Sequence, residues 1–293
     1  MKKVWYFTPV LGSYEMERFS QEAKISGWKF QPIQYKHISV EFNKNSEFRH
    51  LGKRMEFRSG DIAIMRNPKF LDHNDPVFYM TLLYHLRASG VRASNSSQFM
   101  DLSASRDKLF QYYLLDQEGL PIIRPTFFMH SNHLLQKKLD GITQAFIVKP
   151  RSESKGVGIF RINKREDFFM RAKDCPAEGV LLQKFIPNRF DLRVICTPDR
   201  IIGAMKRTAK EGKVVNNFSA GGSVVKYELE DPEIIETCQR TCKLFRCDYL
   251  GVDIILSGKR FYILEVNFFC HFKGFEQATG INFPQEIYTL MDN

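Results

Sequence analysis

The stretch from Tyr249 to Asn267 constrains the fold most, because it predicts a β-hairpin that carries polar side chains in an apolar setting. Two runs rich in Val, Ile, Leu, Phe and Tyr flank a short turn that contains glycine. If the loop is Gly258–Arg260, Asp253 lies directly opposite Glu265. Side chains alternate between the two faces of a strand, so Asn267 shares a face with Glu265. Cβ atoms of cross-strand neighbours lie about 4.5–5.5 Å apart, which lets these side-chain oxygens converge.

This hairpin predicts a site for a hard cation. Mg²⁺ binds oxygen ligands and combines a few carboxylates with substrate phosphates. The positions that flank Asp253 and Glu265 are apolar on both faces, and a carboxylate buried in such a sheet needs a partner. We therefore expect Asp253, Glu265 and Asn267 to hold Mg²⁺, with Mn²⁺ as an alternative ion. The competing interpretation is a hairpin whose acidic side chains only face water.

Length and charge narrow the class of protein. The chain has 293 residues, more than one hydrophobic core usually contains, so two or three subdomains are expected. The net charge of +10 and the pI near 9.3 favour anionic partners such as a nucleotide, an acidic peptide or nucleic acid. Nucleic acid stays the runner-up among these, because the chain has no long basic run and no aromatic-basic repeat.

The cysteines and the first strand indicate the compartment. None of the six cysteines forms a C-x-x-C pair, so we expect no zinc site, and their scatter suits a reducing cytosol. Cys238 and Cys242 have helical spacing and are expected to be packing residues. Thr8 and Pro9 interrupt the first apolar stretch, which predicts a strand and not a signal peptide. No apolar run approaches the roughly 18–20 residues that span a bilayer. We expect a cytoplasmic protein that does not enter the membrane.

The first hundred residues alternate between the strand and helix patterns. Strands are expected at 3–9, 28–35 and 61–65, and helices from Gly12-Ser13 to Gly27 and at 76–89. The charged segment 36–58 predicts loop with short strand pieces. This alternation predicts a small, mainly parallel α/β unit. An open sheet of this kind places a ligand beyond its strand ends, here near Arg66 and Asn95.

The remainder of the chain predicts an α+β arrangement with antiparallel strands. Helices are expected at 105–119, 131–139, 165–172 and 231–245, and strands at 126–129, 145–149, 159–162 and 180–186. A hairpin is expected from 191–197 and 200–207, and 219–223 is expected to be a loop.

Several polar features surround the expected metal site. Lys149 ends an apolar strand and precedes a loop that ends in Gly156-Val157-Gly158, whose backbone N–H groups can close over phosphates. Strand 180–186 can offer backbone groups to an adenine edge. Asp191, Arg193 and Arg207 add one acid and two bases on a hairpin. Each feature alone has an ordinary interpretation as a solvated charge or a buried strand, but their shared order is much harder to attribute to chance.

That order resembles the ATP-grasp superfamily, and within it the RimK-like branch of amino-acid ligases. The resemblance covers roughly residues 95–287. It is carried by these stretches: Ser105-Arg106-Asp107-Lys108-Leu109, Ile147-Val148-Lys149, Gly156-Val157-Gly158, Gln183-Lys184-Phe185-Ile186, Asp191-Leu192-Arg193, Arg207-Thr208-Ala209-Lys210-Glu211-Gly212, Asn217, Gly221-Gly222, Gly251-Val252-Asp253-Ile254, Glu265-Val266-Asn267 and Gly274-Phe275-Glu276-Gln277-Ala278-Thr279-Gly280-Ile281.

The resemblance implies an ATP-grasp fold, of α/β and α+β class, with an N-terminal Rossmann-like (pre-ATP-grasp) α/β domain. The implied boundaries are 1–103 for that domain, 104–186 for the central subdomain and 187–293 for the C-terminal subdomain. ATP would lie between two antiparallel sheets.

The resemblance also implies roles for individual residues. Asp253, Glu265 and Asn267 would bind Mg²⁺, and Arg193 or Arg207 would lie near the γ-phosphate or the acyl phosphate. The implied nucleotide-binding residues are Lys108 and Lys149 at the phosphates, Gly156, Gly158 and Asn217 in loops, Gln183, Lys184, Phe185 and Ile186 at the adenine, and Asp191 at the ribose. Loops 151–158 and 219–223 are expected to act as lids.

The implied activity is an ATP- and Mg²⁺-dependent carboxylate–amine ligase that forms an amide through an acyl phosphate. Its substrate would be an amino acid such as glutamate, joined to a peptide, a protein or a small metabolite, and relatives often form dimers or tetramers. An ATP-grasp kinase and a catalytically dormant nucleotide-binding regulatory module are the alternatives. Where relatives run through small residues after Asn267, this chain has the bulky segment Phe268–Lys273. His271 in that segment is either a base for the amine or an ordinary packed or solvated histidine.

Overall fold

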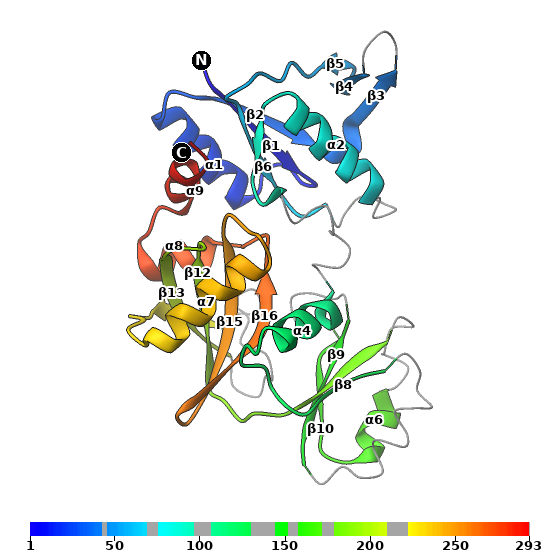
Figure 1. Ribbon diagram of the computed structural model, residues 1–293, viewed down its shortest axis with the longest axis vertical. Helices are drawn as coiled ribbons and strands as arrows, with labels where there is room; N and C mark the ends of the chain where they lie inside the picture. Colours follow the sequence, from blue (N-terminus) through cyan, green and yellow to red (C-terminus); the bar gives the residue numbers. More distant parts are fainter. Residues whose placement is uncertain are drawn as a thin grey trace.

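The N-terminal unit is built on a parallel sheet. A computed structural model describes residues 1–42, 46–68, 76–96, 107–129, 144–151, 158–171, 179–209 and 222–292 (Figure 1). The first sheet has the order β2-β1-β6-β7 and all of its pairs are parallel. Its strands are β1 (Lys3–Thr8), β2 (Lys29–Gln34), β6 (Ile62–Met65) and β7 (Arg92–Ala93). The mainly parallel α/β unit expected from the sequence is confirmed.

Two helices accompany this sheet, α1 (Tyr14–Ile25) and α2 (Pro76–Ala88). Helix α1 begins where the sequence predicts, because the Ser13 side chain accepts a hydrogen bond from the Met16 N–H and caps the first turn. Phe19 and Ala23 lie on its buried face. The segment expected to be loop with strand pieces contains a short 3-10 helix (Tyr35–His37) and a second sheet, β3-β4-β5, formed by Ile38–Phe42, Ser46–His50 and Lys53–Arg54.

The antiparallel central sheet has the order β10-β9-β11-β8. Its strands are β8 (Thr126–Met129), β9 (Phe146–Pro150), β10 (Phe160–Ile162) and β11 (Val180–Lys184), and its helices are α4 (Lys108–Gln117) and α6 (Arg165–Arg171). Phe146, Val148, Phe160 and Phe168 belong to a small separate core at this sheet. The helix predicted at 131–139 lies outside the described residues.

The third large sheet is antiparallel, with the order β14-β13-β12-β15-β16. Its strands are β12 (Phe190–Cys196), β13 (Ile201–Thr208), β14 (Ser223–Lys226), β15 (Leu250–Ser257) and β16 (Arg260–Asn267). Helix α7 (Pro232–Leu244) packs against it, begins at proline and is capped by Asp231, and its Cys238 and Cys242 lie in the core as expected. The expected loop 219–223 is wrong at its last residue, since Ser223 pairs with Thr208 and begins β14.

The hairpin of β15 and β16 has the predicted pairing of Asp253 with Glu265, but its turn and register differ from the prediction. Its turn has two residues and not three, because Ser257 pairs with Arg260. A turn of this length would slip the register by one and send Glu265 to the opposite face. The register shifts beside Asp253, where Leu264 is the extra residue of a β-bulge, and Asp253 pairs with Glu265 as predicted.

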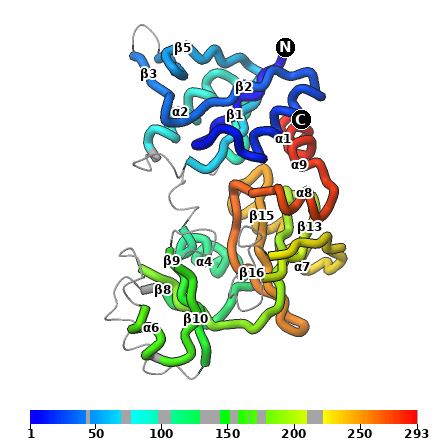
Figure 2. The backbone as a smooth tube through the Cα atoms, turned by 180° about the vertical axis from the view of Figure 1, so that it is seen from behind, coloured from blue at the N-terminus to red at the C-terminus, as the bar shows by residue number. Residues whose placement is uncertain are grey.

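The C-terminal helices pack beside the N-terminal unit. After β16, helices α8 (Lys273–Thr279) and α9 (Phe283–Asp292), which the sequence did not reveal, lead to a C-terminus beside α1 (Figures 1 and 2). One apolar core joins Val4, Tyr6 and Phe19 of the first unit to side chains from the third sheet and both last helices. Burial of this core therefore couples the first and last parts of the chain.

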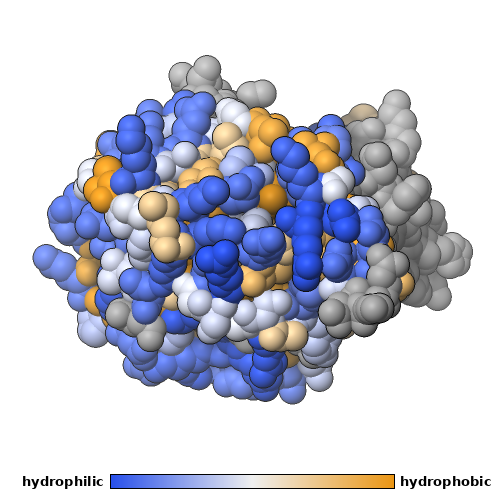
Figure 3. Space-filling view, turned by 90° about the horizontal axis from the view of Figure 1, so that it is seen from above, coloured by the Kyte–Doolittle hydropathy of each residue, from blue (hydrophilic) through white to orange (hydrophobic). Residues whose placement is uncertain are grey.

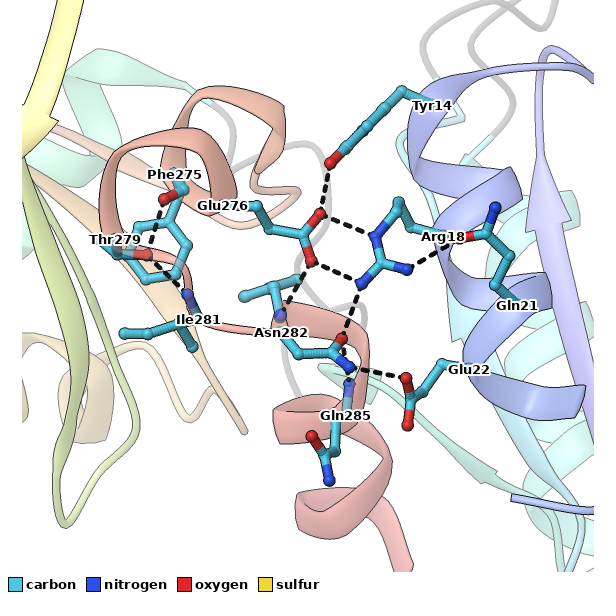
Figure 4. A network of polar contacts seen from close by, with 11 residues as sticks. Tyr14, Arg18, Gln21, Glu22, Phe275, Glu276, Thr279, Ile281, Asn282 and Gln285 are labelled. Carbon is cyan, nitrogen blue, oxygen red and sulfur yellow. Dashed lines mark hydrogen bonds and ion pairs between the residues drawn. The ribbon is translucent and has the colours of Figure 1, made fainter. Parts of the chain in front are cut away.

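Polar contacts reinforce this junction (Figure 4). Glu276 on α8 accepts hydrogen bonds from the Tyr14 hydroxyl at 2.5 Å and from Arg18 Nε at 3.0 Å. Arg18 Nη2 also donates to Asn282 Oδ1 at 3.0 Å, and Asn282 Nδ2 donates to Glu22 Oε2 at 2.7 Å. The motif around Glu276 thus fixes the two last helices to α1.

The surface of the N-terminal end is mainly hydrophilic, with hydrophobic side chains in small patches (Figure 3). Exposed apolar residues such as Phe42, Leu51 and Met170 are spread over different elements. Within the described part of the chain, no helix has the length and apolar character needed to cross a membrane.

Candidate functional site

Polar residues from four neighbouring strands share one face of the five-stranded sheet. Arg207 on β13 pairs with Asp191 on β12, and Arg193 on β12 pairs with Asp253 on β15. Asp253 pairs in turn with Glu265 on β16. Because residues two apart along a strand share a face, Asn267 joins the same surface. We call these six residues the polar face: Asp191, Arg193, Arg207, Asp253, Glu265 and Asn267. The structure therefore brings together the predicted metal ligands and both predicted catalytic arginines.

Ion pairs hold the polar face in one arrangement. Arg193 Nε and Nη2 donate to the two oxygens of Asp253, each at 2.7 Å. Arg207 Nη2 lies 2.9 Å from Asp253 Oδ2, and Arg207 Nε donates to Asp191 Oδ1 at 2.6 Å. Burial alone raises the pKa of Asp253, but the two guanidinium groups lower it to about 2. For Asp191 burial outweighs Arg207, and its pKa is raised. Asp253 is thus an ionised carboxylate with two cations.

Lys149 on the central sheet faces these charges. Its Nζ donates to Gln183 Oε1 at 2.7 Å, and Gln183 Nε2 donates to Thr126 Oγ1 at 3.2 Å and to the Tyr112 hydroxyl. Burial lowers the pKa of Lys149 to about 8, an effect that Lys108 strengthens and the charge of Glu265 opposes. Lys149 is thus within electrostatic range of Lys108 and of the acidic residues of the polar face. An anion bound near both lysines would relieve the repulsion between them.

The structure describes only some of the residues that were predicted to bind phosphate. Lys108 begins α4 directly after the cap Asp107, its side chain is buried, and its N–H donates to Arg151 O at 3.2 Å. Gly158 has φ +69°, and a Cβ there would lie 2.7 Å from Pro150 Cγ, so packing against Pro150 already requires glycine. Gly156, Asn217 and most of the two expected lids lie outside the described residues.

The predicted adenine segment has part of its backbone in use. The Lys184 N–H donates to Pro125 O at 3.1 Å, and the Phe185 N–H donates to Ala145 O at 2.9 Å. An adenine edge would therefore need the other backbone groups of residues 183–186. Arg161 lies over the Phe185 ring, with 4.3 Å between Cζ and the ring centroid.

The polar face fits a magnesium ion that is completed by phosphates. No group of three His, Cys, Asp or Glu side chains suited to a metal occurs among the residues the structure describes. The protein would instead supply two carboxylates and one amide, a set typical of Mg²⁺ held together with a substrate. Asn267 Nδ2 is buried and has no hydrogen-bond partner in the described structure. The oxygen and nitrogen of an amide group are assigned from their hydrogen-bond partners, so the Asn267 side chain can equally turn its oxygen to this position. An amide without a protein partner here suits a site that a bound ligand completes.

Helix α4 supports this hairpin through two residues that sequence reasoning missed. Gln111 donates from Nε2 to Val266 O at 3.3 Å and accepts from the Val266 N–H at 3.2 Å. The Tyr112 hydroxyl donates to Leu264 O, in the bulge, at 3.3 Å. The signal in the sequence is a glutamine on the apolar face of a helix, which needs a partner when buried.

At the edge of the parallel sheet, Arg66 and Asn95 bind the segments that flank the β15–β16 hairpin. Asn95, with φ +53°, accepts from the N–H groups of Asp248 and Tyr249 and donates to the carbonyl groups of Tyr249 and Phe268. Arg66 Nη1 donates to Cys270 O at 3.1 Å. Both side chains are buried and hold the two ends of the β15–β16 hairpin. The ligand expected near these two residues stays a prediction, and the structure shows that their own side chains pack against the segments that flank β15 and β16.

Comparisons with known proteins agree with this arrangement. The model of the RimK-like ATP-grasp domain matches residues 105–291. A protein of Vibrio vulnificus (strain YJ016) named probable alpha-L-glutamate ligase is 27% identical over 286 residues, which cover 95% of this chain and 91% of that protein.

Two solved structures are similar along their whole length. The ATP-grasp ligase PsnB, complexed with a phosphomimetic variant of its minimal precursor, Mg and ADP, has a TM-score of 0.73 and 18% identity, covering 99% of this chain and 97% of PsnB. The macrocyclase MdnC of Microcystis aeruginosa MRC, bound with the precursor peptide MdnA, has a TM-score of 0.71 and 13% identity, covering 99% of each chain. These likenesses show the ATP-grasp fold that the sequence predicts. Since the family match spans well over half of the chain, the protein belongs to the RimK-like ATP-grasp family.

Proposed function

We propose that the protein is an ATP- and Mg²⁺-dependent ligase that joins a carboxylate to an amine through an acyl phosphate. The observation that carries this proposal is the polar face, where Asp253, Glu265 and Asn267 lie beside two arginines and across from Lys149. Such a set of cations and oxygen ligands suits phosphoryl transfer, which depends on positioning and charge neutralisation.

Each predicted site residue has a role in this proposal. Asp253, Glu265 and Asn267 hold Mg²⁺, which supplies charge neutralisation at the phosphates. The side chains of Lys108 and Lys149 bind the phosphates, and the backbone of residues 183–186 holds the adenine. Asp191 lies nearer the ribose, where its pairing with Arg207 fixes the carboxylate. Gly156, Gly158 and Asn217 complete the nucleotide site.

The chemistry needs no covalent nucleophile from the protein. An oxygen of the substrate carboxylate attacks the γ-phosphorus and ADP leaves; the amine then attacks the acyl carbon and phosphate leaves. Arg193 and Arg207 each direct Nε and Nη2 at carboxylate partners, which fixes the plane of the guanidinium group. A cation held this rigidly stabilises a developing oxyanion without reorganising. Exclusion of water protects the acyl phosphate from hydrolysis.

The substrate class follows from charge and relatives. The net charge of +10 favours an acidic substrate. Relatives are named probable alpha-L-glutamate ligases, and solved neighbours were bound with precursor peptides. The proposed reaction therefore adds an amino acid such as glutamate to a peptide, a protein or a small metabolite.

The test measures ADP release and product mass with the full chain, ATP, Mg²⁺, the standard amino acids and glutamate-ended peptides. We expect sustained ADP turnover only when acid and amine are both present, together with an amide product, because the acyl phosphate must react with the amine before the next turnover. If ADP forms without any amine and a stable phosphate ester accumulates, the protein is a kinase. If no ADP forms, it is a dormant nucleotide-binding module. Lys149→Ala should abolish turnover in a folded protein, while Lys226→Ala, in an exposed pair, serves as the matched control.

A further inference from the structure

A histidine in the segment after β16 and a glutamate on α1 form a pair, although they are distant in the sequence. His271 Nδ1 lies 2.9 Å from Glu15 Oε1. The two side chains differ in exposure, 64% for His271 and 12% for Glu15. The carboxylate is therefore inside the protein, while the imidazole reaches outward. Within the described residues, the structure shows no partner for the second ring nitrogen, Nε2.

The surroundings of Glu15 fix which nitrogen carries the proton. Burial alone raises the pKa of Glu15, but the hydrogen bond with His271 and the charge of Arg66 lower it to about 2. An ionised carboxylate only accepts hydrogen bonds, so Nδ1 is the protonated nitrogen. The Nε2 atom of the neutral imidazole then carries a lone pair. A carboxylate that orients an imidazole in this way is a common device for making the other nitrogen a base.

His271 of this pair follows the expected metal ligands closely along the chain, since the segment that carries it leaves β16 directly after Asn267. A Cβ atom placed on Gly251, which pairs with Asn267, would lie 3.1 Å from Cys270 Sγ, 3.6 Å from Asn267 Cβ and 3.8 Å from Arg193 Cδ. Cys270 Sγ also donates to Asn267 O at 3.4 Å, so Cys270 contacts the polar face directly at Asn267. Arg66 holds the carbonyl of Cys270, and His271 is the next residue in the chain. The segment that places His271 is therefore anchored both to the polar face and to the N-terminal unit.

We propose that His271 is the general base that deprotonates the incoming amine, and that Glu15 is its positioning residue. This inference rests on the ligase function proposed above. An amine reaches the protein as an ammonium ion, which has no lone pair with which to attack. Nε2 takes one proton from it, and the free amine then forms the C–N bond to the acyl carbon. The C–O bond to phosphate breaks, the leaving phosphate takes the second proton from nitrogen, and the imidazolium returns its proton to solvent.

The competing interpretation is a surface ion pair with no role in the reaction. A pair of this kind contributes little to stability and can be lost with little effect. The two interpretations differ in one measurable respect. A base matters only for a nucleophile that arrives protonated, whereas a structural pair affects all nucleophiles alike.

Hydroxylamine separates these cases, because it is small and largely neutral at pH 7 and so needs no base. The experiment uses the full chain with ATP, Mg²⁺ and tri-L-glutamate as the carboxylate, and offers either L-glutamate or hydroxylamine as the nucleophile. Amide and hydroxamate are both quantified. The variants are His271→Asn, His271→Gln and Glu15→Gln, and His37→Asn, an exposed histidine in another part of the chain, is the control.

We expect His271→Asn and His271→Gln to form the amide about 10²–10⁴-fold more slowly, the usual contribution of a general base, with hydroxamate formation close to wild type. Glu15→Gln keeps a hydrogen-bond acceptor but loses the charge, so it should slow the amide less and leave the hydroxamate unchanged. An unchanged amide rate in the His271 variants overturns the proposal. Equal loss of both products also overturns it, since His271 would then serve folding or acyl-phosphate formation. If the wild type makes neither product, the ligase function itself fails.

Discussion

At the scale of single residues, burial disfavours the charged forms of both Lys149 and the polar-face residue Asp253, but the outcomes differ. Burial lowers the pKa of Lys149 to about 8, so its ammonium form is held at a cost, whereas Asp253 stays ionised because Arg193 and Arg207 surround it. The sequence predicted which residues these are, but not their partners. Gln183, the acceptor for Lys149, was predicted at the adenine, and only the pairing of β9 with β11 reveals the contact.

The shifted pKa of Lys149 predicts a pH dependence of ATP binding. Below pH 8 the side chain is charged and attracts phosphates; above it the amine is neutral, so affinity should fall with rising pH, by at most about tenfold per pH unit. Calorimetric titration with a non-hydrolysable ATP analogue and Mg²⁺ between pH 7 and 9.5 measures this slope. Lys149→Met should bind more weakly and lose the slope. The same slope in the variant would show that another group titrates.

At the scale of elements, local patterns carried most of the prediction. The hairpin, the capped helix α1 and the proline-initiated helix α7 were all predicted from residues close in sequence. The two-residue turn and the bulge at Leu264 were not, because the carbonyl of Leu264 is held by Tyr112 from a distant helix. Helix α8 was missed since its N-cap, Phe272, makes no side-chain hydrogen bond.

Gly158 offers a test of whether packing alone accounts for a glycine in the phosphate-loop motif. Both Gly158 and Gly119 have positive φ, but a Cβ would meet Pro150 only at Gly158. Gly119→Ala should therefore cost about 1 kcal/mol of unfolding free energy from backbone strain, and Gly158→Ala about 1–3 kcal/mol more from overpacking. Urea denaturation of the two variants gives the difference. Equal losses would mean that Pro150 moves aside freely.

At the scale of the whole molecule, the first and last parts of the chain form one structure. Side chains of β1, α1, α8 and α9 share a core, and α1 also provides Glu15, the partner of His271. The sequence predicted separate domains in order along the chain. It could not show that the C-terminal helices pack on the N-terminal unit, because contacts between residues such as Arg18 and Glu276 leave no local pattern.

This junction predicts unequal effects for two similar substitutions. Glu276→Gln keeps the shape of a side chain that is 10% exposed and removes the charge that Arg18 binds, whereas Glu228 is 71% exposed and pairs with Lys226. We expect a loss of about 1–3 kcal/mol for Glu276→Gln and at most about 0.5 kcal/mol for Glu228→Gln. Urea unfolding of the full chain at pH 7 measures both. Comparable losses would contradict a stabilising role for the junction.

The ligase chemistry is tested most directly by following oxygen from the carboxylate to the phosphate. The full chain is given ATP, Mg²⁺, L-glutamate and tri-L-glutamate labelled with ¹⁸O in its carboxylates, and inorganic phosphate is analysed by mass. Because the attacking oxygen stays on phosphorus when the amine displaces it, each amide bond should release one phosphate that carries one ¹⁸O. Amide formation with unlabelled phosphate, or label retained in a phosphate ester, would contradict an acyl-phosphate ligase.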